Sequence, residues 1–369
     1  MIYLDNGATS LHKPKSVHQA VNRALHCCAN PGRGGHDAAE EATRQVFACR
    51  VEAEQMFSCP AERIVMTMNC THGLNIAIKS LILPGKRVVI SGFEHNAVTR
   101  PLHALGAKIQ VAGRKLFDWG DTLQTFEDAL KKGADAAVFT HVSNVFGYIL
   151  PVEEMAALCR HYAVPFILDV AQSAGVLPVD MKALGAAYIA MPGHKGLLGP
   201  QGTGLLLCGD EPKPLLYGGT GSVSKNQEMP EYLPDLLEAG TLNVPGIAGL
   251  TAGMRYVKDR GIHKIFAQEH SAMVQAVADL QDLGLHTFAG EHQAATVSFA
   301  PKMDTEELAQ MLNKQGIAVR AGLHCAPLAH ESAGTLETGT IRLSFGHDAN
   351  PCQNAHLRSA LAKIIPSGS

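Results

Sequence analysis

Two residues that could take part in catalysis lie at the end of a short apolar run or just after one. Lys195 comes after the apolar residues 188–191 and stands beside His194 at the start of a loop, residues 193–204, that contains five glycines. Asp169 lies at the end of a second apolar run, residues 165–170. A lysine in a turn is ordinarily a solvated surface residue, so the interpretation of Lys195 depends on Asp169.

Asp169 closes a strand that we expect to be buried on both faces, where an unpaired charge is costly. It therefore needs a cation beside it. The protonated pyridine nitrogen of pyridoxal phosphate is such a cation, because sites for this cofactor pair a Schiff-base lysine with an aspartate at that nitrogen. The alternative is a metal ligand, but no His, Cys or Glu cluster at ligand spacing lies near Asp169, and we expect no metal site.

Two other segments also follow predicted strands. Residues 69–75 lie between a strand and a helix, an arrangement that points free backbone N–H groups at an anion such as a phosphate. An ordinary helix N-cap would give the same pattern. Residues 93–97 place His95 after the next strand and bring an aromatic ring to the same sheet edge.

Helices and short apolar strands alternate over the first 210 residues. This pattern predicts βαβ units and a mostly parallel sheet, whose ligands gather outside the carboxyl ends of the strands. The expected strands are 63–68, 87–91, 134–142, 165–170, 186–191 and 204–208, and the expected helices are 15–29, 37–57, 71–83 and 152–162.

The pattern changes after residue 246. A long helix to about residue 283 leads into a smaller α+β region, with strands at 294–300, 318–321 and 340–345 and helices at 305–315 and 354–364. We therefore expect an N-terminal segment 1–15 that packs with the small domain, a large cofactor-binding domain 16–250, and a small C-terminal domain 251–369 that carries Cys325 and Arg342.

Composition excludes several classes of protein. The 369 residues are 46% hydrophobic and 18% charged with a net charge of −3, which is globular and lacks the basic footprint of a nucleic-acid binder. No apolar run approaches the roughly 20 residues of a membrane span, and the start shows no signal peptide. Nine scattered cysteines without a C-x-x-C pair indicate thiols in a reducing compartment, so we expect a cytoplasmic protein.

Eight segments, in order along the chain, resemble the class V aminotransferase fold type of pyridoxal-phosphate enzymes, and within it the cysteine desulfurase and selenocysteine lyase family. They are residues 3–10 (YLDNGATS), 30–33 (NPGR), 94–95, 141–144, 169–172, 193–195, 238–241 and 320–325 (RAGLHC). The resemblance spans nearly the whole chain. It implies an α/β protein of fold-type I. The large domain would contain a mostly parallel sheet of the seven-stranded type flanked by helices, and a smaller α+β domain would follow at the C-terminus.

The resemblance implies roles for the residues around the cofactor ring. Lys195 resembles the Schiff-base lysine and Asp169 the partner of the pyridine nitrogen. His95 resembles the residue that stacks on the ring and helps with proton transfer. Asn144 and Gln172 resemble the residues that contact the substrate side and the phenolic oxygen.

Other matches concern the phosphate and the substrate. Cys70, Thr71 and His194 resemble the phosphate-binding groups. Thr241 resembles a residue that reaches the phosphate of the neighbouring subunit, which implies a homodimer with composite sites. Arg342 resembles the arginine that grips the substrate carboxylate, for which a planar bidentate fork is suited.

Two positions depart from the family pattern. Pro192 stands where a hydroxyl residue is usual three places before the lysine, which removes an O–H donor and a backbone N–H. Cys70 stands where threonine is common. Both changes weaken the expected phosphate site, whereas Lys195, Asp169 and Cys325 are intact.

Cys325 distinguishes between possible reactions. A desulfurase needs a thiolate that takes sulfur from cysteine, and we expect Arg320 and His324 to supply positive charge that favours the thiolate. The alternative for Cys325 is a structural cysteine, which is the commoner kind. The short R-x-G-x-x-C loop resembles the group of the family that passes persulfide to an acceptor protein and can also act on selenocysteine.

The resulting hypothesis is a pyridoxal-phosphate-dependent cysteine desulfurase that converts L-cysteine to L-alanine, leaves a persulfide on Cys325 and serves iron–sulfur cluster assembly or other thio-cofactors. A selenocysteine lyase acting on L-selenocysteine, and an aminotransferase or epimerase on the same fold, are the alternatives. A binding protein without a cofactor is the fourth possibility, against which the Lys195–Asp169 pair argues.

Overall fold

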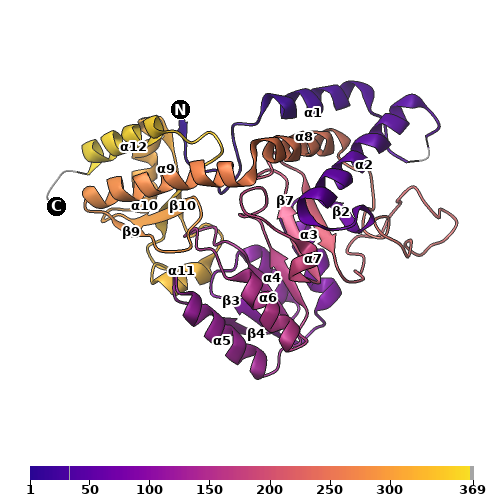
Figure 1. The fold of residues 1–369 in the computed structure, drawn as a ribbon, viewed down its shortest axis with the longest axis horizontal. Coiled ribbons are helices and arrows are strands. Elements are labelled where there is room, and N and C mark those ends of the chain that lie inside the picture. Colours follow the sequence, from indigo (N-terminus) through magenta and orange to yellow (C-terminus); the bar gives the residue numbers. More distant parts are fainter. Residues whose placement is uncertain (33, 366–369) are drawn as a thin grey trace.

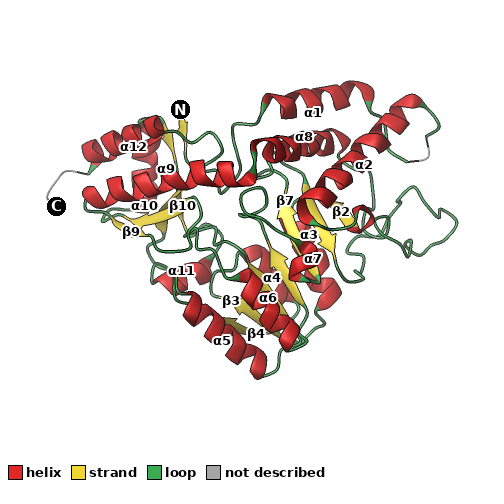
Figure 2. Ribbon diagram, in the orientation of Figure 1, coloured by secondary structure: helices red, strands yellow, loops and turns green. Residues whose placement is uncertain are grey.

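The computed structural model describes residues 1–32 and 34–365, so Arg33 of the NPGR segment and residues 366–369 lie outside it. A large α/β lobe contains a central sheet with helices on both faces, and a smaller lobe packs beside it (Figures 1 and 2). The N-terminus lies at the smaller lobe.

The central sheet has seven strands in the order β2-β8-β7-β6-β5-β3-β4. All neighbouring pairs are parallel except those of β8, which runs antiparallel to β7 and β2. The predicted mainly parallel α/β sheet is therefore confirmed. The strands are β2 (Ile64–Thr67), β3 (Arg87–Ser91), β4 (Lys108–Ala112), β5 (Ala136–Thr140), β6 (Phe166–Asp169), β7 (Tyr188–Pro192) and β8 (Gly204–Cys208).

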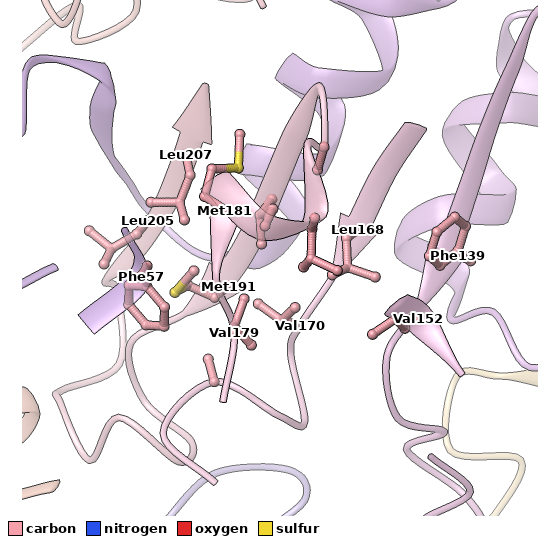
Figure 3. Packing of buried hydrophobic residues seen from close by; sticks show 14 of the residues in the cluster. Phe57, Phe139, Val152, Leu168, Val170, Val179, Met181, Met191, Leu205 and Leu207 are labelled. Atoms are coloured by element: carbon pink, nitrogen blue, oxygen red, sulfur yellow. The ribbon is translucent and has the colours of Figure 1, made fainter. Parts of the chain in front are cut away.

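Alternate residues of the central strands enter different cores, which explains why these strands read as continuous apolar runs. Leu168, Met191 and Leu207 face one side and pack with Phe57 and Met181, as Figure 3 shows. The helices that contribute to this core are α2 (Asp37–Phe57), α5 (Trp119–Lys131), α6 (Val152–His161), α7 (Met181–Leu184), α8 (Val244–Arg260) and α11 (Pro327–Ala333). Opposite, α3 (Cys70–Leu81) and α4 (Asn96–Ala104) cover the sheet.

The smaller lobe is built on an antiparallel sheet in the order β12-β13-β10-β9 with a core of its own. The N-terminal segment joins this lobe, because β1 pairs with β11 and Leu4 lies in its core. The strands are β1 (Ile2–Tyr3), β9 (His286–Phe288), β10 (Thr296–Ala300), β11 (Ile317–Ala318), β12 (Arg320–Gly322) and β13 (Thr340–Ser344). The helices are α9 (Ile262–Asp282), α10 (Thr305–Lys314) and α12 (Pro351–Ile364).

Some local predictions were wrong or incomplete. The single helix expected from residue 246 to about 283 is two helices, because Gly261 adopts a φ of 87° that ends α8 and precedes α9. The helix expected at 15–29 ends earlier, as α1 (Lys15–Cys27), and η1 (Ala61–Arg63) precedes β2. The boundary expected at residues 250–251 falls inside α8, and the division into domains stays a prediction. None of the helices in the described residues has the length and apolar character of a bilayer span.

Candidate active site

The chemistry-bearing residues meet at one edge of the central sheet. Strands β2, β3, β5, β6 and β7 run in one direction, so their carboxyl ends share that edge, where ligands of such sheets gather. A cavity of about 190 Å³ lies there. Eight predicted site residues line it together with Pro192: Cys70, Thr71, His95, Asn144, Asp169, Gln172, His194 and Lys195.

Asp169 is a buried carboxylate with one oxygen available to the cavity. Its Oδ1 accepts hydrogen bonds from the backbone N–H of Ala171 (2.8 Å) and the thiol of Cys70 (3.5 Å). Its Oδ2 has no hydrogen bond within the described residues. Burial raises the pKa of Asp169, and the Ala171 N–H and the charge of Lys195 oppose that rise. The carboxylate is therefore suited to a cationic group placed in the cavity.

Lys195 lies three positions after the last residue of β7 and is half-buried at the edge of the cavity. Burial lowers the pKa of Lys195, and the nearby Arg342 guanidinium lowers it further, while Asp169 acts in the opposite direction. Within the described part of the chain, its ammonium nitrogen forms no hydrogen bond or ion pair. These surroundings favour the neutral amine, which is the nucleophilic form.

His95 is the N-cap residue of α4 and lines the cavity with a neutral ring. Its Nδ1 accepts a hydrogen bond from the backbone N–H of Ala97 at 3.0 Å. Burial lowers the pKa of His95 to about 4, and the charge of Lys195 contributes. Because Nδ1 is an acceptor in this contact, Nε2 carries the proton of the neutral ring.

The N-terminal segment forms part of the site. From the sequence it was expected only to pack with the small domain. Ala8 lines the cavity. Gln172 Nε2 donates to the carbonyl of Gly7 (3.0 Å), and the His194 ring nitrogen Nδ1 lies 3.0 Å from the hydroxyl of Thr9. The only available signal was the YLDNGATS motif. Its contacts hold two predicted cofactor ligands in place.

The first turn of α3 (Cys70–Leu81) forms part of the cavity wall. Asn69 caps this helix through its side-chain oxygen, which accepts from the N–H of His72 at 2.9 Å. Cys70 and Thr71 are the first two residues of the helix and both line the cavity, and such first-turn N–H groups have no partner inside the helix. The N-cap interpretation is therefore confirmed, whereas the anion site stays a prediction, and the Cys70 thiol is directed to Asp169.

Glu94 is a second buried carboxyl beside the site, and no role was predicted for it. Its Oε1 accepts from the Ser91 hydroxyl and from the backbone N–H of Thr140 (2.9 Å), whose strand partner is Asp169. Its Oε2 is buried without a partner among the described residues. Burial raises the pKa of Glu94 to about 8, and the charge of Asp169 adds to the rise. Glu94 is therefore largely protonated at neutral pH.

The raised pKa of Glu94 predicts a dependence of stability on pH. An unfolded glutamate releases its proton near pH 4.5, whereas folded Glu94 keeps it to about pH 8. The contribution of Glu94 to the free energy of unfolding should therefore fall as pH rises between these values, by about a few kcal/mol. We expect Glu94→Gln to reduce this slope in urea unfolding of the cofactor-free protein from pH 5 to pH 8.5.

Glu269, whose pKa burial raises to about 8 as well, should retain its own share of that slope in the Glu94→Gln variant. Replacing the exposed Glu153 by glutamine is the matched control and should leave the slope unchanged. Identical slopes for wild type and Glu94→Gln would contradict the assignment.

Cys325 lies in the loop between β12 and α11 and is exposed. Its carbonyl accepts a hydrogen bond from the N–H of Asn96 (2.8 Å), the residue after His95, and the preceding carbonyl of His324 accepts from Asn144 Nδ2 (2.8 Å). His324 and Cys325 both have a positive φ, 50° and 57°. The loop is thus fastened to two residues of the cavity region in a backbone conformation that non-glycine residues rarely adopt.

The expected charge of His324 is wrong. Its side chain is buried and its Nε2 lies 3.2 Å from the Thr340 hydroxyl. Burial lowers the pKa of His324 to about 2, and the adjacent Arg342 contributes, so the ring is neutral. Arg320 is the remaining predicted cation of this loop. It is half-exposed and lies 4.0 Å from Asp5.

Arg342 contacts a residue of the cavity wall but does not itself line the cavity. Its guanidinium is 2% exposed, with Nη1 donating to the carbonyl of Asn144 (3.0 Å) and Nη2 donating to Asp5. Its Nε is buried without a partner in the described residues. A methyl group on Gly7 would come within 3.2 Å of the guanidinium carbon, so glycine allows this close packing. Asp5 is a partner that the sequence analysis did not foresee.

Thr241 lies apart from the Lys195 cavity within this chain. It lines two other hollows, one with His72 and Asn243 and one with Arg50 and Glu238. Glu238, from the same EAGT segment, receives a hydrogen bond from Arg50 at 2.6 Å. The structure therefore brings together the other predicted cofactor-binding residues but leaves Thr241 outside.

The comparison with family models gives one match over most of the chain. The model of the family described as "Aminotransferase class-V" matches residues 2–353. Among curated proteins, a "Probable cysteine desulfurase" of Pyrococcus abyssi is 34% identical, over 94% of this chain and 89% of that protein.

Solved structures give the same picture. The apo structure of a cysteine desulfurase from Thermococcus onnurineus superposes with a TM-score of 0.90 at 30% identity, over 99% of this chain and 94% of that one. A cysteine desulfurase from Escherichia coli, CsdA, gives a TM-score of 0.84 at 26% identity, over 98% and 94% of the two chains.

Proposed function

The chain belongs to the class-V aminotransferase family, and from that membership we propose that it is a pyridoxal-phosphate-dependent cysteine desulfurase. Its substrate is L-cysteine and its products are L-alanine and a persulfide on Cys325. The observation that carries the proposal is the fastening of the Cys325 loop, through Asn96 and Asn144, to the cavity that contains Lys195 and Asp169.

The residues of the cavity fit pyridoxal phosphate. The free oxygen of buried Asp169 suits a protonated ring nitrogen, and the first turn of α3 suits a phosphate. Lys195 would hold the cofactor covalently, and His95 and Gln172 would contact its ring and phenolic oxygen. The backbone of Cys70 together with Thr71 and His194 would hold its phosphate. When bound, the cofactor supplies an electron sink that stabilises negative charge on the substrate carbon atoms.

The protein residues then bind the substrate and move protons. Lys195, whose pKa burial lowers, can accept and return a proton at its Nζ. His95 holds a proton on Nε2 while its Nδ1 bond to Ala97 fixes the ring. Arg342, whose Nη1 donates to the backbone carbonyl of Asn144, would receive the substrate carboxylate by turning from Asp5 into the cavity that Asn144 lines.

Sulfur transfer takes place at Cys325. Its sulfur bonds to the sulfur of the substrate, and the bond between that sulfur and the substrate β-carbon breaks. Cys325 thiol and L-cysteine thereby give a Cys325 persulfide and L-alanine, with one proton ending on the former β-carbon. The reaction needs no external oxidant. Formation of the sulfur–sulfur bond oxidises the sulfur atoms, and the reduction of the substrate β-carbon to the methyl group of alanine balances it.

The proposal is tested by measuring alanine and total persulfide or sulfide from L-cysteine with the cofactor-loaded enzyme. We expect equal amounts of alanine and transferred sulfur. If alanine forms from L-selenocysteine but not from L-cysteine, the protein is a selenocysteine lyase. Transfer of the amino group to a keto acid, without sulfur release, would favour an aminotransferase.

We propose further that the active protein is a homodimer in which Thr241 completes the phosphate site of the partner subunit. The exposure of Cys325 suits delivery of sulfur to an acceptor protein, as iron–sulfur cluster assembly requires. The nine free cysteines suit a reducing compartment such as the cytoplasm.

The composite site predicts that activity and dimerisation are lost together. On dilution, light scattering and activity should show that the active species has twice the chain mass of 39.2 kDa. Thr241→Ala should weaken cofactor retention without changing that mass. A fully active species of 39.2 kDa would overturn the composite site.

A further inference from the structure

Cys70 brings a buried thiol to the cavity of Lys195, and the function proposed above uses only its backbone. It is the first residue of α3 and lines the cavity together with Asp169. Its Sγ lies 3.5 Å from Asp169 Oδ1, and within the described residues this oxygen is the one hydrogen-bond partner of the thiol. The thiol is therefore directed to the carboxylate that would meet the cofactor ring.

The carboxylate of Asp169 is held from two sides. Its Oδ1 accepts from the backbone N–H of Ala171 at 2.8 Å as well as from Cys70. One donor lies in the segment after β6 and the other at the start of α3, so together they fix how the carboxylate is turned. Its Oδ2 has no hydrogen bond to residues 1–32 or 34–365, although Asp169 is only 3% exposed. Oδ2 is therefore the oxygen left for a ligand in the cavity.

The thiol is the donor of this hydrogen bond. Burial raises the pKa of Cys70 well above its usual value, and the charge of Asp169 raises it further, while Lys195 opposes the rise. Cys70 therefore keeps its proton at neutral pH and is a poor nucleophile, because the thiolate is the reactive form. The donated hydrogen bond in turn stabilises the negative charge of Asp169 and lowers the pKa of its carboxyl.

The alternative role for the thiol is a contact with the cofactor phosphate, because Cys70 stands at the start of a helix. A thiol is a weak donor, and Thr71 and His194 in the wall of the same cavity offer a hydroxyl and an imidazole instead. The single S–H proton is also already directed to Asp169. This geometry favours the ring-nitrogen side of the cofactor over its phosphate side.

We propose that Cys70 is a positioning residue for Asp169, whose Oδ1 it holds so that Oδ2 is aimed at the ring nitrogen of the bound cofactor. The inference rests on the proposed pyridoxal phosphate site. A protonated ring nitrogen needs an ionised and correctly turned carboxylate, so the thiol strengthens cofactor binding through that nitrogen. Cys70 forms no covalent bond and takes no proton in the reaction.

The test titrates the cofactor-free protein with three probes: pyridoxal phosphate, pyridoxal without the phosphate, and the benzaldehyde analogue of pyridoxal phosphate, in which a C–H group replaces the ring nitrogen. We expect Cys70→Ala to weaken the binding of pyridoxal phosphate and of pyridoxal by about three- to tenfold, the effect of losing one hydrogen bond from a weak donor. The analogue should bind wild type and variant equally. Cys159→Ala, which removes a buried thiol of α6, is the matched control and should change none of the three affinities.

Each other pattern of affinities overturns the proposal. Weaker binding of pyridoxal phosphate and the analogue, with unchanged binding of pyridoxal, would assign the thiol to the phosphate. Equal weakening of all three probes would show a general effect of the space left by the sulfur atom, and no weakening would show that the thiol has no role. A wild type that binds none of the probes would contradict the cofactor itself, and with it the proposed function.

A second measurement needs neither the cofactor nor a stable Cys70 variant. In the infrared spectrum of the cofactor-free protein, an S–H group that donates to a carboxylate absorbs at lower frequency than more weakly bonded thiols. Asp169→Ala removes the acceptor, so one low-frequency S–H band should move to higher frequency while the bands of the other thiols stay in place. An S–H spectrum that Asp169→Ala leaves unchanged would overturn the contact and the proposal.

Discussion

Replacing Lys195 by alanine should abolish the visible absorption band of the purified protein and reduce alanine formation from L-cysteine by at least about 10⁴-fold. The variant loses both the amine that would hold the cofactor and the group that moves the substrate proton. No other lysine lines the cavity among the described residues. Spectra before and after borohydride, followed by peptide mapping, measure the first effect, and alanine assays measure the second.

The control for this experiment is Lys182→Ala, which removes an exposed lysine of α7 and should leave band and rate unchanged. The Lys195→Ala protein should still fold, because the Asp169 contacts to Ala171 and Cys70 remain. Retention of a borohydride-reducible band with an adduct on a different lysine would show that Lys195 is the wrong residue.

Replacing Cys325 by serine should reduce desulfuration of L-cysteine by at least about 10²-fold, with the bound cofactor and the spectral response to cysteine retained. A serine hydroxyl is not ionised at neutral pH and cannot hold a persulfide. The site that binds cysteine is unaffected, because Asn96 and Asn144 hold this loop through the backbone carbonyls of Cys325 and His324. Alanine formation and the substrate-induced absorption change measure the two effects.

Selenocysteine turnover should fall less in the same variant, because selenium is the better leaving group and depends less on attack by a thiolate. Cys352→Ser, which removes the other exposed cysteine, is the matched control and should retain both activities. Undiminished cysteine turnover in Cys325→Ser would remove this thiol from the mechanism and favour the aminotransferase or epimerase alternative.

Much of the site could be predicted because its residues lie at the ends of apolar strands or shortly after them. Strands β6 and β7 are buried on both faces and are therefore mostly apolar, so Asp169 at the end of β6 and the pair His194 and Lys195 after β7 stand out. Parallel strands then bring such positions to one edge, and His95 after β3 joins them. Local pattern and sheet direction were sufficient for these residues.

The charge states were decided by burial, which the sequence does not display. His324 reads as a cation beside Cys325, yet its ring is enclosed near Arg342 and stays neutral. In the sequence Glu94 is only the neighbour of His95, yet in the structure it is a fully buried carboxyl that keeps its proton to about pH 8. In both cases the packing of distant segments removes water from the group and disfavours its charged form.

The α/β class, the mainly parallel sheet and the resemblance to the family follow from the amino-acid sequence, because these depend on periodicity, strand-end residues and ordered motifs. The folded chain was needed to show that Asp5 pairs with Arg342, that Gly7 and Thr9 contact Gln172 and His194, and that Thr241 lies outside the cavity of its own chain. These contacts join residues more than 150 positions apart. No local pattern encodes them, because they arise only when the small lobe and the N-terminal segment pack against the sheet edge.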